Sequence, residues 1–148
     1  MTIRQRSARE RRAFVDTSAY LALLDGDDSY HRDAVAIVTS LADYRYRQYT
    51  TNVLLIEAHA LLLSSLGMVP AAQFLRDMAE SHTAVVRVRA ADETRAQQII
   101  FQYTDKDFSF ADAISFAVME RLDIGLVFTF DQHFAQYGFT VLTPSTLP

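Results

Sequence analysis

Ala13-Phe-Val-Asp16-Thr-Ser18 is the stretch that decides the fold, because a short apolar run ends there in an acid and a helix-start signal. Leu126-Val-Phe-Thr-Phe-Asp131 repeats this arrangement near the other end of the chain. Both runs are typical of buried strands that pass directly into helices. Asp16 and Asp131 are therefore predicted to lie at the carboxyl ends of strands, where open α/β sheets bind their ligands.

Helical and strand patterns alternate between these two stretches. Predicted strands cover 48–51, 84–88, 125–130 and 139–142 in addition to 13–16. Predicted helices cover 17–25, 29–44, 52–67, 69–81, 92–103, 109–122 and 131–137, and Asn52 is expected to cap the third of these. This alternation predicts an α/β fold, with a mainly parallel sheet of about five strands between two layers of helices.

The charge is unevenly distributed along the chain. Residues 1–12 contain five arginines and one glutamate, so the net charge of −4 leaves −8 for the remainder. We expect residues 1–12 to form a basic N-terminal arm without fixed structure, and residues 13–148 to form one domain. The arm is either a frayed end or a contact for phosphates.

The composition excludes several kinds of site and indicates where the protein is located. The chain has no cysteine, which excludes disulfides and thiolate metal sites. It has no apolar run of the roughly 20 residues that cross a bilayer and no apolar segment after the arginines, so we expect a cytoplasmic protein without a membrane contact. Phosphate-binding glycine loops and nucleophile elbows are also missing from the sequence.

Four acids are the candidate functional residues: Asp16, Glu57, Asp112 and Asp131. Glu57 has Val53, Leu54, Ala60 and Leu61 as its helix neighbours, so it projects from an apolar face. A cluster of carboxylates without nearby lysines or arginines in the sequence indicates a divalent metal with oxygen ligands. Each acid except Glu57 also has a structural explanation, because Asp16 and Asp131 precede helices and Ser109-Phe-Ala-Asp112 resembles a capping box.

The histidines contribute less to this prediction. His31, His82 and His133 show no metal-ligand spacing among themselves, so the predicted site contains no histidine.

Four segments together resemble the PIN-domain nucleases, over residues 13–143. They are Phe14-Val-Asp-Thr-Ser-Ala-Tyr-Leu21, Leu54-Leu-Ile-Glu57, Ser109-Phe-Ala-Asp112-Ala and Val127-Phe-Thr-Phe-Asp131-Gln-His-Phe134. The compact size is similar to that of the VapC-type toxins of toxin–antitoxin pairs. The resemblance implies a three-layer α/β/α fold and a ribonuclease that uses Mg²⁺ or Mn²⁺. The family's acidic quartet falls on Asp16, Glu57, Asp112 and Asp131, with Thr17 and Ser109 as supporting hydroxyls.

The chemistry of phosphodiester hydrolysis agrees with this resemblance. Metal held by carboxylates lowers the pKa of bound water and screens the charge that grows on the phosphate oxygens. We expect Asp16 and Asp112 to make the tightest metal contacts, while Glu57 and Asp131 bind through water or orient the nucleophile.

Other classes remain as alternatives. A housekeeping RNA-processing nuclease and a metal-stabilised binding module without turnover both fit the acids. A phosphorylated receiver is disfavoured because the single lysine, Lys106, lies in a predicted loop. A haloacid-dehalogenase-type phosphatase is disfavoured because Ser18 stands where its second aspartate belongs.

The expected partners are RNA, a second copy of the chain and an antitoxin that blocks the acidic cleft. Only nine basic residues lie outside residues 1–12, so a shared groove in a homodimer would double their number. The apolar residues considered for that contact are Tyr30, Val35, Met68, Val69, Phe74 and Met78.

Overall fold

A computed structural model describes residue 7 and residues 10–147. Most of the expected basic arm lies outside these residues. The described strands are β1 (Arg12–Val15), β2 (Arg47–Thr51), β3 (Ala84–Val86), β4 (Leu126–Phe128) and β5 (Thr140–Val141). The described helices are α1 (Thr17–Leu24), α2 (His31–Asp43), α3 (Asn52–Leu66), α4 (Met68–Glu80), α5 (Ala90–Gln102), α6 (Phe110–Leu122) and α7 (His133–Tyr137).

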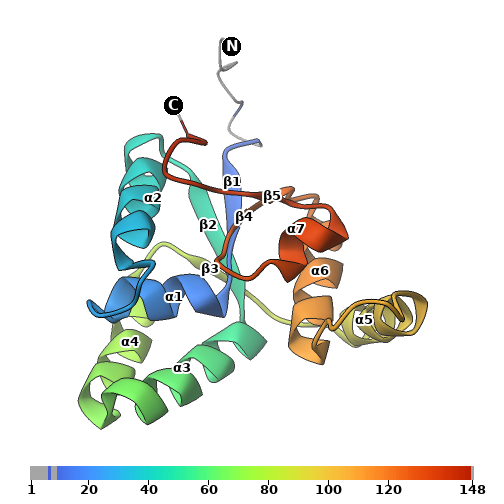
Figure 1. Cartoon of the computed structure of the whole chain (residues 1–148), viewed down its shortest axis with the longest axis horizontal. Coiled ribbons are helices and arrows are strands. Elements are labelled where there is room, and N and C mark those ends of the chain that lie inside the picture. The colour runs from blue at the N-terminus through green and yellow to red at the C-terminus, as the bar shows by residue number, and fades with distance from the viewer. Residues whose placement is uncertain (1–6, 8–9, 148) are drawn as a thin grey trace.

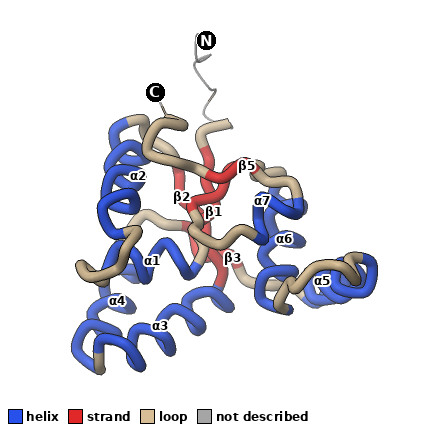
Figure 2. The backbone as a smooth tube through the Cα atoms, viewed as in Figure 1, coloured by secondary structure: helices blue, strands red, loops and turns tan. Residues whose placement is uncertain are grey.

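The strands form one sheet in the order β3-β2-β1-β4-β5, and every neighbouring pair is parallel. Helices α1 to α4 lie on one side of the sheet and α5 to α7 on the other (Figure 1). Figure 2 shows the strands as the middle layer between the two groups of helices. The predicted three-layer α/β/α fold with a parallel sheet is confirmed.

Alternation along the strands divides the core between the two sides. Ala13 and Val15 of β1 belong to the cluster under α1 to α4, whereas Phe14 belongs to the cluster under α5 to α7. In β4, Leu126 and Phe128 take the first side and Val127 takes the second. Because successive side chains of a strand point to opposite faces, a strand buried on both faces is apolar throughout.

The start of α3 differs from the prediction. Thr51, rather than Asn52, caps this helix, because the Thr51 hydroxyl accepts a hydrogen bond from the Leu54 N–H at 3.1 Å. The Asn52 side chain instead accepts from the N–H of Val88 at 3.0 Å. Strand β3 also ends at Val86 rather than at residue 88, because its partner β2 ends at Thr51, the residue paired with Val86.

A buried ion pair on the α5–α6 side was not predicted. The Arg121 guanidinium donates to both carboxylate oxygens of Asp92, each at 2.9 Å, and Asp92 is 3% exposed. Asp92 also accepts from the N–H of Arg89, at the start of α5. The pair therefore fixes the beginning of α5 to the end of α6.

No helix among the described residues is long and apolar enough to span a membrane.

Candidate metal centre

Asp16 lies where the central strand β1 ends, and the neighbouring strand β4 fixes its position. The N–H of Asp16 donates to the carbonyl of Phe128 at 3.0 Å, which continues the pairing of β1 with β4. The side chain forms no capping hydrogen bond with α1 although Asp16 is the residue before that helix. The capping explanation therefore does not account for this carboxylate.

Two hydroxyl groups hold the Asp16 carboxylate. Thr129 donates to Oδ2 at 2.8 Å and Ser18 donates to the same oxygen at 2.9 Å. Both hydroxyls are in turn tied to the backbone after β4, because Thr129 accepts from the N–H of Asp131 and Ser18 accepts from the N–H of Phe130. This network fixes the direction of the carboxylate and places it beside the loop that carries Asp131.

Burial makes the charge on Asp16 costly. Asp16 is 5% exposed, and no basic side chain among the described residues forms an ion pair with it. Burial raises the pKa of Asp16 to about 6; the hydroxyl hydrogen bonds oppose the rise, and the charge of Asp112 adds to it. A buried carboxylate without a cation is a position where a bound metal ion would be stabilising.

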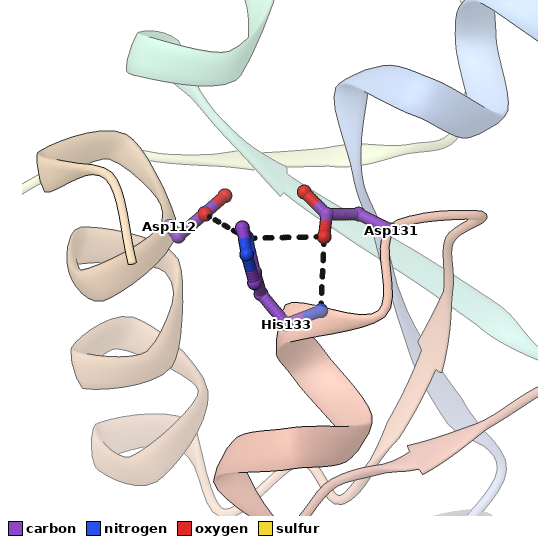
Figure 3. Close-up of side chains that lie close together, drawn as sticks. All are labelled: Asp112, Asp131 and His133. Atoms are coloured by element: carbon purple, nitrogen blue, oxygen red, sulfur yellow. Dashed lines mark hydrogen bonds and ion pairs between the residues drawn. The ribbon is translucent and has the colours of Figure 1, made fainter. Parts of the chain in front are cut away.

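Asp112, Asp131 and His133 form the second part of the site. One ligand atom from each of these residues lies within 4.8 Å of the others. The Nδ1 of His133 is 2.8 Å from Oδ2 of Asp112 and 3.1 Å from Oδ1 of Asp131. Figure 3 shows the imidazole between the two carboxylates, which come from α6 and from the loop after β4.

Local turns present these side chains. Ser109 and Asp112 form the predicted capping box, in which the Ser109 hydroxyl accepts from the Asp112 N–H and Oδ2 of Asp112 accepts from the Ser109 N–H. Asp131 accepts from the N–H of His133 at 2.9 Å, and α7 begins at His133 rather than at residue 131. Asp112 thus both caps its helix and belongs to the cluster.

The donor set suits a divalent cation. The hydrogen bonds just described use Oδ2 of Asp16 and Asp112 and Oδ1 of Asp131, so none of them occupies the other oxygen of these three carboxylates. Carboxylate oxygens are ligands for Mg²⁺ and Mn²⁺. The residues present therefore fit a metal centre.

Glu57 lies farther along α3 and does not belong to the cluster formed by Asp112, Asp131 and His133. It is half-buried, as its apolar neighbours predicted. The Thr17 hydroxyl donates to the carbonyl of Leu54 at 3.4 Å, which joins the residue after Asp16 to α3 one turn before Glu57. Thr17 therefore supports the packing of two site-bearing helices.

Comparison with known proteins places this geometry in a family. The family model described as "PIN domain" matches residues 13–140. The chain is 30% identical over 131 residues to the 23S rRNA-specific endonuclease VapC20 of Mycobacterium tuberculosis, covering 88% of this chain and 98% of that protein. The chain belongs to the VapC family of PIN-domain proteins.

Another VapC relative and the solved structures agree with this assignment. A VapC ribonuclease of Archaeoglobus fulgidus is 30% identical over 126 residues, covering 83% of this chain and 79% of that protein. The crystal structure of M. tuberculosis VapC20, described as a Sarcin-Ricin loop cleaving toxin, superposes with a TM-score of 0.83 over 89% of this chain and 99% of that one. A toxin-antitoxin complex from Klebsiella pneumoniae shares the fold, with a TM-score of 0.64 at 18% identity over 89% of this chain and 97% of that one.

Sequence reasoning does not identify three polar residues of this candidate site. The spacing among the histidines does not indicate His133, because its partners are aspartates, one of them only two residues away. Ser18 and Thr129 were not identified as carboxylate donors. Their only sequence signal is a hydroxyl two residues from an acid, after Asp16 and before Asp131.

Proposed function

We propose that this protein is a metal-dependent ribonuclease and the toxin of a toxin–antitoxin pair. The observation that carries the proposal is the grouping of Asp112, Asp131 and His133 within 4.8 Å, close enough to the buried Asp16 for the charge of Asp112 to raise the Asp16 pKa. Relatives of similar length carry the names endonuclease and ribonuclease, which supports RNA as the substrate.

Each of these side chains has a separate proposed role. Asp16 and Asp112 would contact the cation directly, whereas Asp131 and Glu57 would act through water or orient the nucleophile. A divalent cation bound here, Mg²⁺ or Mn²⁺, would activate water and screen the charge that grows on the phosphate. Thr129 and Ser18 would keep the Asp16 carboxylate aimed into the site, and His133 would fix the spacing of Asp112 and Asp131.

RNA cleavage with and without metal tests this function. The purified protein is expected to cleave RNA in Mg²⁺ or Mn²⁺ and to stop in EDTA. Asp112→Asn should abolish cleavage. Asp105→Asn is the matched control, because Asp105 is 76% exposed in a loop and contacts Lys106. Cleavage that persists in EDTA would contradict the metal mechanism, and metal-dependent stability without cleavage would indicate a binding module.

An antitoxin and a second copy of the chain are the partners we propose. The acidic cleft would accept an arginine from an antitoxin segment, since a guanidinium pairs with carboxylates in a bidentate manner. The name of the K. pneumoniae structure, a toxin-antitoxin complex, supports such a partner. As a toxin, this protein should arrest growth when it is expressed alone. Co-expression of a DNA-binding antitoxin encoded by a small upstream gene should relieve the arrest, whereas a constitutive RNA-processing enzyme would need no such relief.

Exposed apolar side chains in the first turn of α4 support a homodimer. Met68 is 73% exposed and Val69 is 74% exposed, while Phe74 is buried and Met78 packs against the core. A dimer contact would remove Met68 and Val69 from water, at about 25 cal/mol per Å² of apolar surface. Light scattering at micromolar concentration should therefore give twice the monomer mass, and Met68→Asp with Val69→Asp should give the monomer.

A further inference from the structure

A pocket adjoins the metal centre on the side of α2. Its volume is about 280 Å³, and Asp131 and Thr129 line it together with residues of α2 and of the segment after β5. Figure 1 shows that this C-terminal segment returns from β5 toward α2. The lining residues are Tyr30, Asp33, Ile37, Thr129, Phe130, Asp131, Gln132, Val141, Leu142, Thr143 and Pro144.

An aromatic pair forms part of this lining. The rings of Tyr30 and Phe130 are stacked, with centroids 4.7 Å apart and an interplanar angle of 13°. Phe130 also contacts Phe128 and packs against the core, whereas Tyr30 is 50% exposed. Tyr30 is therefore the more accessible ring of the pair.

The backbone holds Tyr30 in place. Its N–H donates to the Asp28 carboxylate at 2.8 Å, and its carbonyl accepts from the N–H of Ala34 in the first turn of α2. An aromatic ring on a fixed backbone loses little conformational entropy when a flat ligand stacks on it.

Charge decides which part of a nucleotide fits. The residues of the described chain that line the pocket include two carboxylates, Asp33 and Asp131, and no lysine, arginine or histidine. These carboxylates repel a phosphate but accept hydrogen bonds from the N–H groups of a base. The pocket is thus suited to the uncharged, flat part of a nucleotide.

We propose that this pocket receives the nucleobase of a nucleotide next to the scissile phosphate, stacked on Tyr30. The inference rests on the proposed RNA substrate. Single-stranded RNA is commonly bound by stacking its bases on aromatic side chains. Asp131 belongs to both the metal centre and the pocket, so a strand with one phosphate at the acids has a neighbouring base within reach. A pocket of 280 Å³ is below the usual 300–1,000 Å³ of drug-sized sites, which suits a single base.

A fluorescent base provides the direct test. RNA oligonucleotides carrying 2-aminopurine at successive positions would be added in Mg²⁺ to the protein with Asp112→Asn, so that the strand remains intact. At one position, stacking on Tyr30 should quench the fluorescence. Tyr30→Ala should restore the fluorescence and Tyr30→Phe should retain the quenching. Tyr44→Ala is the matched control, because Tyr44 is 40% exposed at the other end of the same helix.

Cleavage kinetics provide the second test, with Asp112 restored. Tyr30→Ala should raise KM about tenfold with little change in kcat, since stacking on an aromatic ring contributes that order of affinity per base. An abasic nucleotide at the quenched position should raise KM of the unmodified protein equally and add nothing in Tyr30→Ala. Melting curves confirm that each variant is folded.

The outcomes separate this inference from the proposed function. Metal-dependent cleavage with equal KM for Tyr30→Ala and Tyr44→Ala would leave the ribonuclease standing and overturn the base pocket. Quenching at one position in the Asp112→Asn protein, together with no cleavage by the protein that retains Asp112, would support the pocket and contradict the ribonuclease. An oligonucleotide that binds without quenching at any position, or does not bind, would overturn the pocket.

Discussion

The carboxylates of Asp16 and of the pair Asp112–Asp131 belong to the same proposed metal centre but are held in opposite ways. Asp16 is 5% exposed at the end of the central strand, where two hydroxyls fix one of its oxygens. Asp112 and Asp131 are partly exposed and contact one another through His133. Burial provides a fixed direction but makes the charge costly, whereas partial exposure leaves the carboxylates hydrated and adjustable.

The largest expected effect compares the two parts directly. Asp16→Asn should reduce RNA cleavage more than a hundredfold, because it removes a proposed direct ligand, and outer partners of metal sites already account for about 10–100-fold. Asp131→Asn should reduce cleavage about tenfold, since we propose that Asp131 acts through water. Both rates would be measured at saturating Mg²⁺. Equal losses would show that the buried and exposed parts bind the metal alike.

The second prediction concerns the cost of burying Asp16. Its pKa is about 6 in the folded protein and 3.8 as a free side chain, so the folded state retains a proton that the unfolded chain has lost between these values. The extra proton on Asp16 therefore stabilises the folded state by about 3 kcal/mol when no metal is bound, as in EDTA. This stabilisation is fully present below pH 3.8 and is lost as the pH rises through 6.

Asp16→Asn is the control for this pH dependence, because its side-chain oxygen can still accept from both hydroxyls. Urea unfolding at pH 4.5 and pH 7 would compare the two proteins. As the pH rises from 4.5 to 7, wild type should lose stability relative to Asp16→Asn. A difference that stays constant with pH would mean that the Asp16 carboxyl is better solvated than its position indicates.

The third prediction addresses the hydroxyls. Thr129→Val conserves volume but removes the donor to Asp16 and the acceptor for the N–H of Asp131. We expect metal affinity, measured by titrating Mn²⁺ against activity, to fall about 10–100-fold. Thr50→Val is the matched control, because Thr50 is an equally buried threonine that donates to the carbonyl of Val15. Similar metal affinity in both variants would remove Thr129 from the site.

The smallest effect is expected at Ser109, and comparing it with Asp112→Asn separates the two roles of Asp112. Ser109→Ala removes the hydroxyl that caps α6 and should lower the free energy of unfolding by about 1 kcal/mol, with less than a tenfold change in activity. Asp112→Asn keeps an oxygen for the Ser109 N–H and should lose activity with little loss of stability in EDTA. A clear loss of stability in Asp112→Asn with activity retained would show that Asp112 has a purely structural role.

The sequence predicted features that depend on short range or on periodicity. The apolar runs at 13–15 and 126–130 and the helix-start signals predicted a mainly parallel sheet but not its strand order, and they placed Asp16 and Asp131 at strand ends. The Ser109–Asp112 capping box was visible because its residues are three apart. These are interactions for which local spacing determines the geometry.

Contacts between distant residues could not be predicted in this way. Thr129 reaches Asp16 only because β4 pairs with β1, and Arg121 reaches Asp92 only because α5 packs on α6. The residue that caps α3 also depends on tertiary structure, because the Asn52 side chain accepts a hydrogen bond from the N–H of Val88 and is not available as the cap. Hydroxyl and imidazole groups carry no periodic signal, so their partners emerge only from the packed fold.

The position of β1 between β2 and β4 has a consequence for synthesis of the chain. Strand β2 can pair with β1 early, but the other side of β1 stays open until residues 126–128 have emerged from the ribosome. The proposed metal centre combines Asp16, which directly follows the first strand, with Asp112, Asp131 and His133 from a much later part of the chain. A nascent chain therefore cannot assemble the proposed metal centre before residue 133 has emerged from the ribosome.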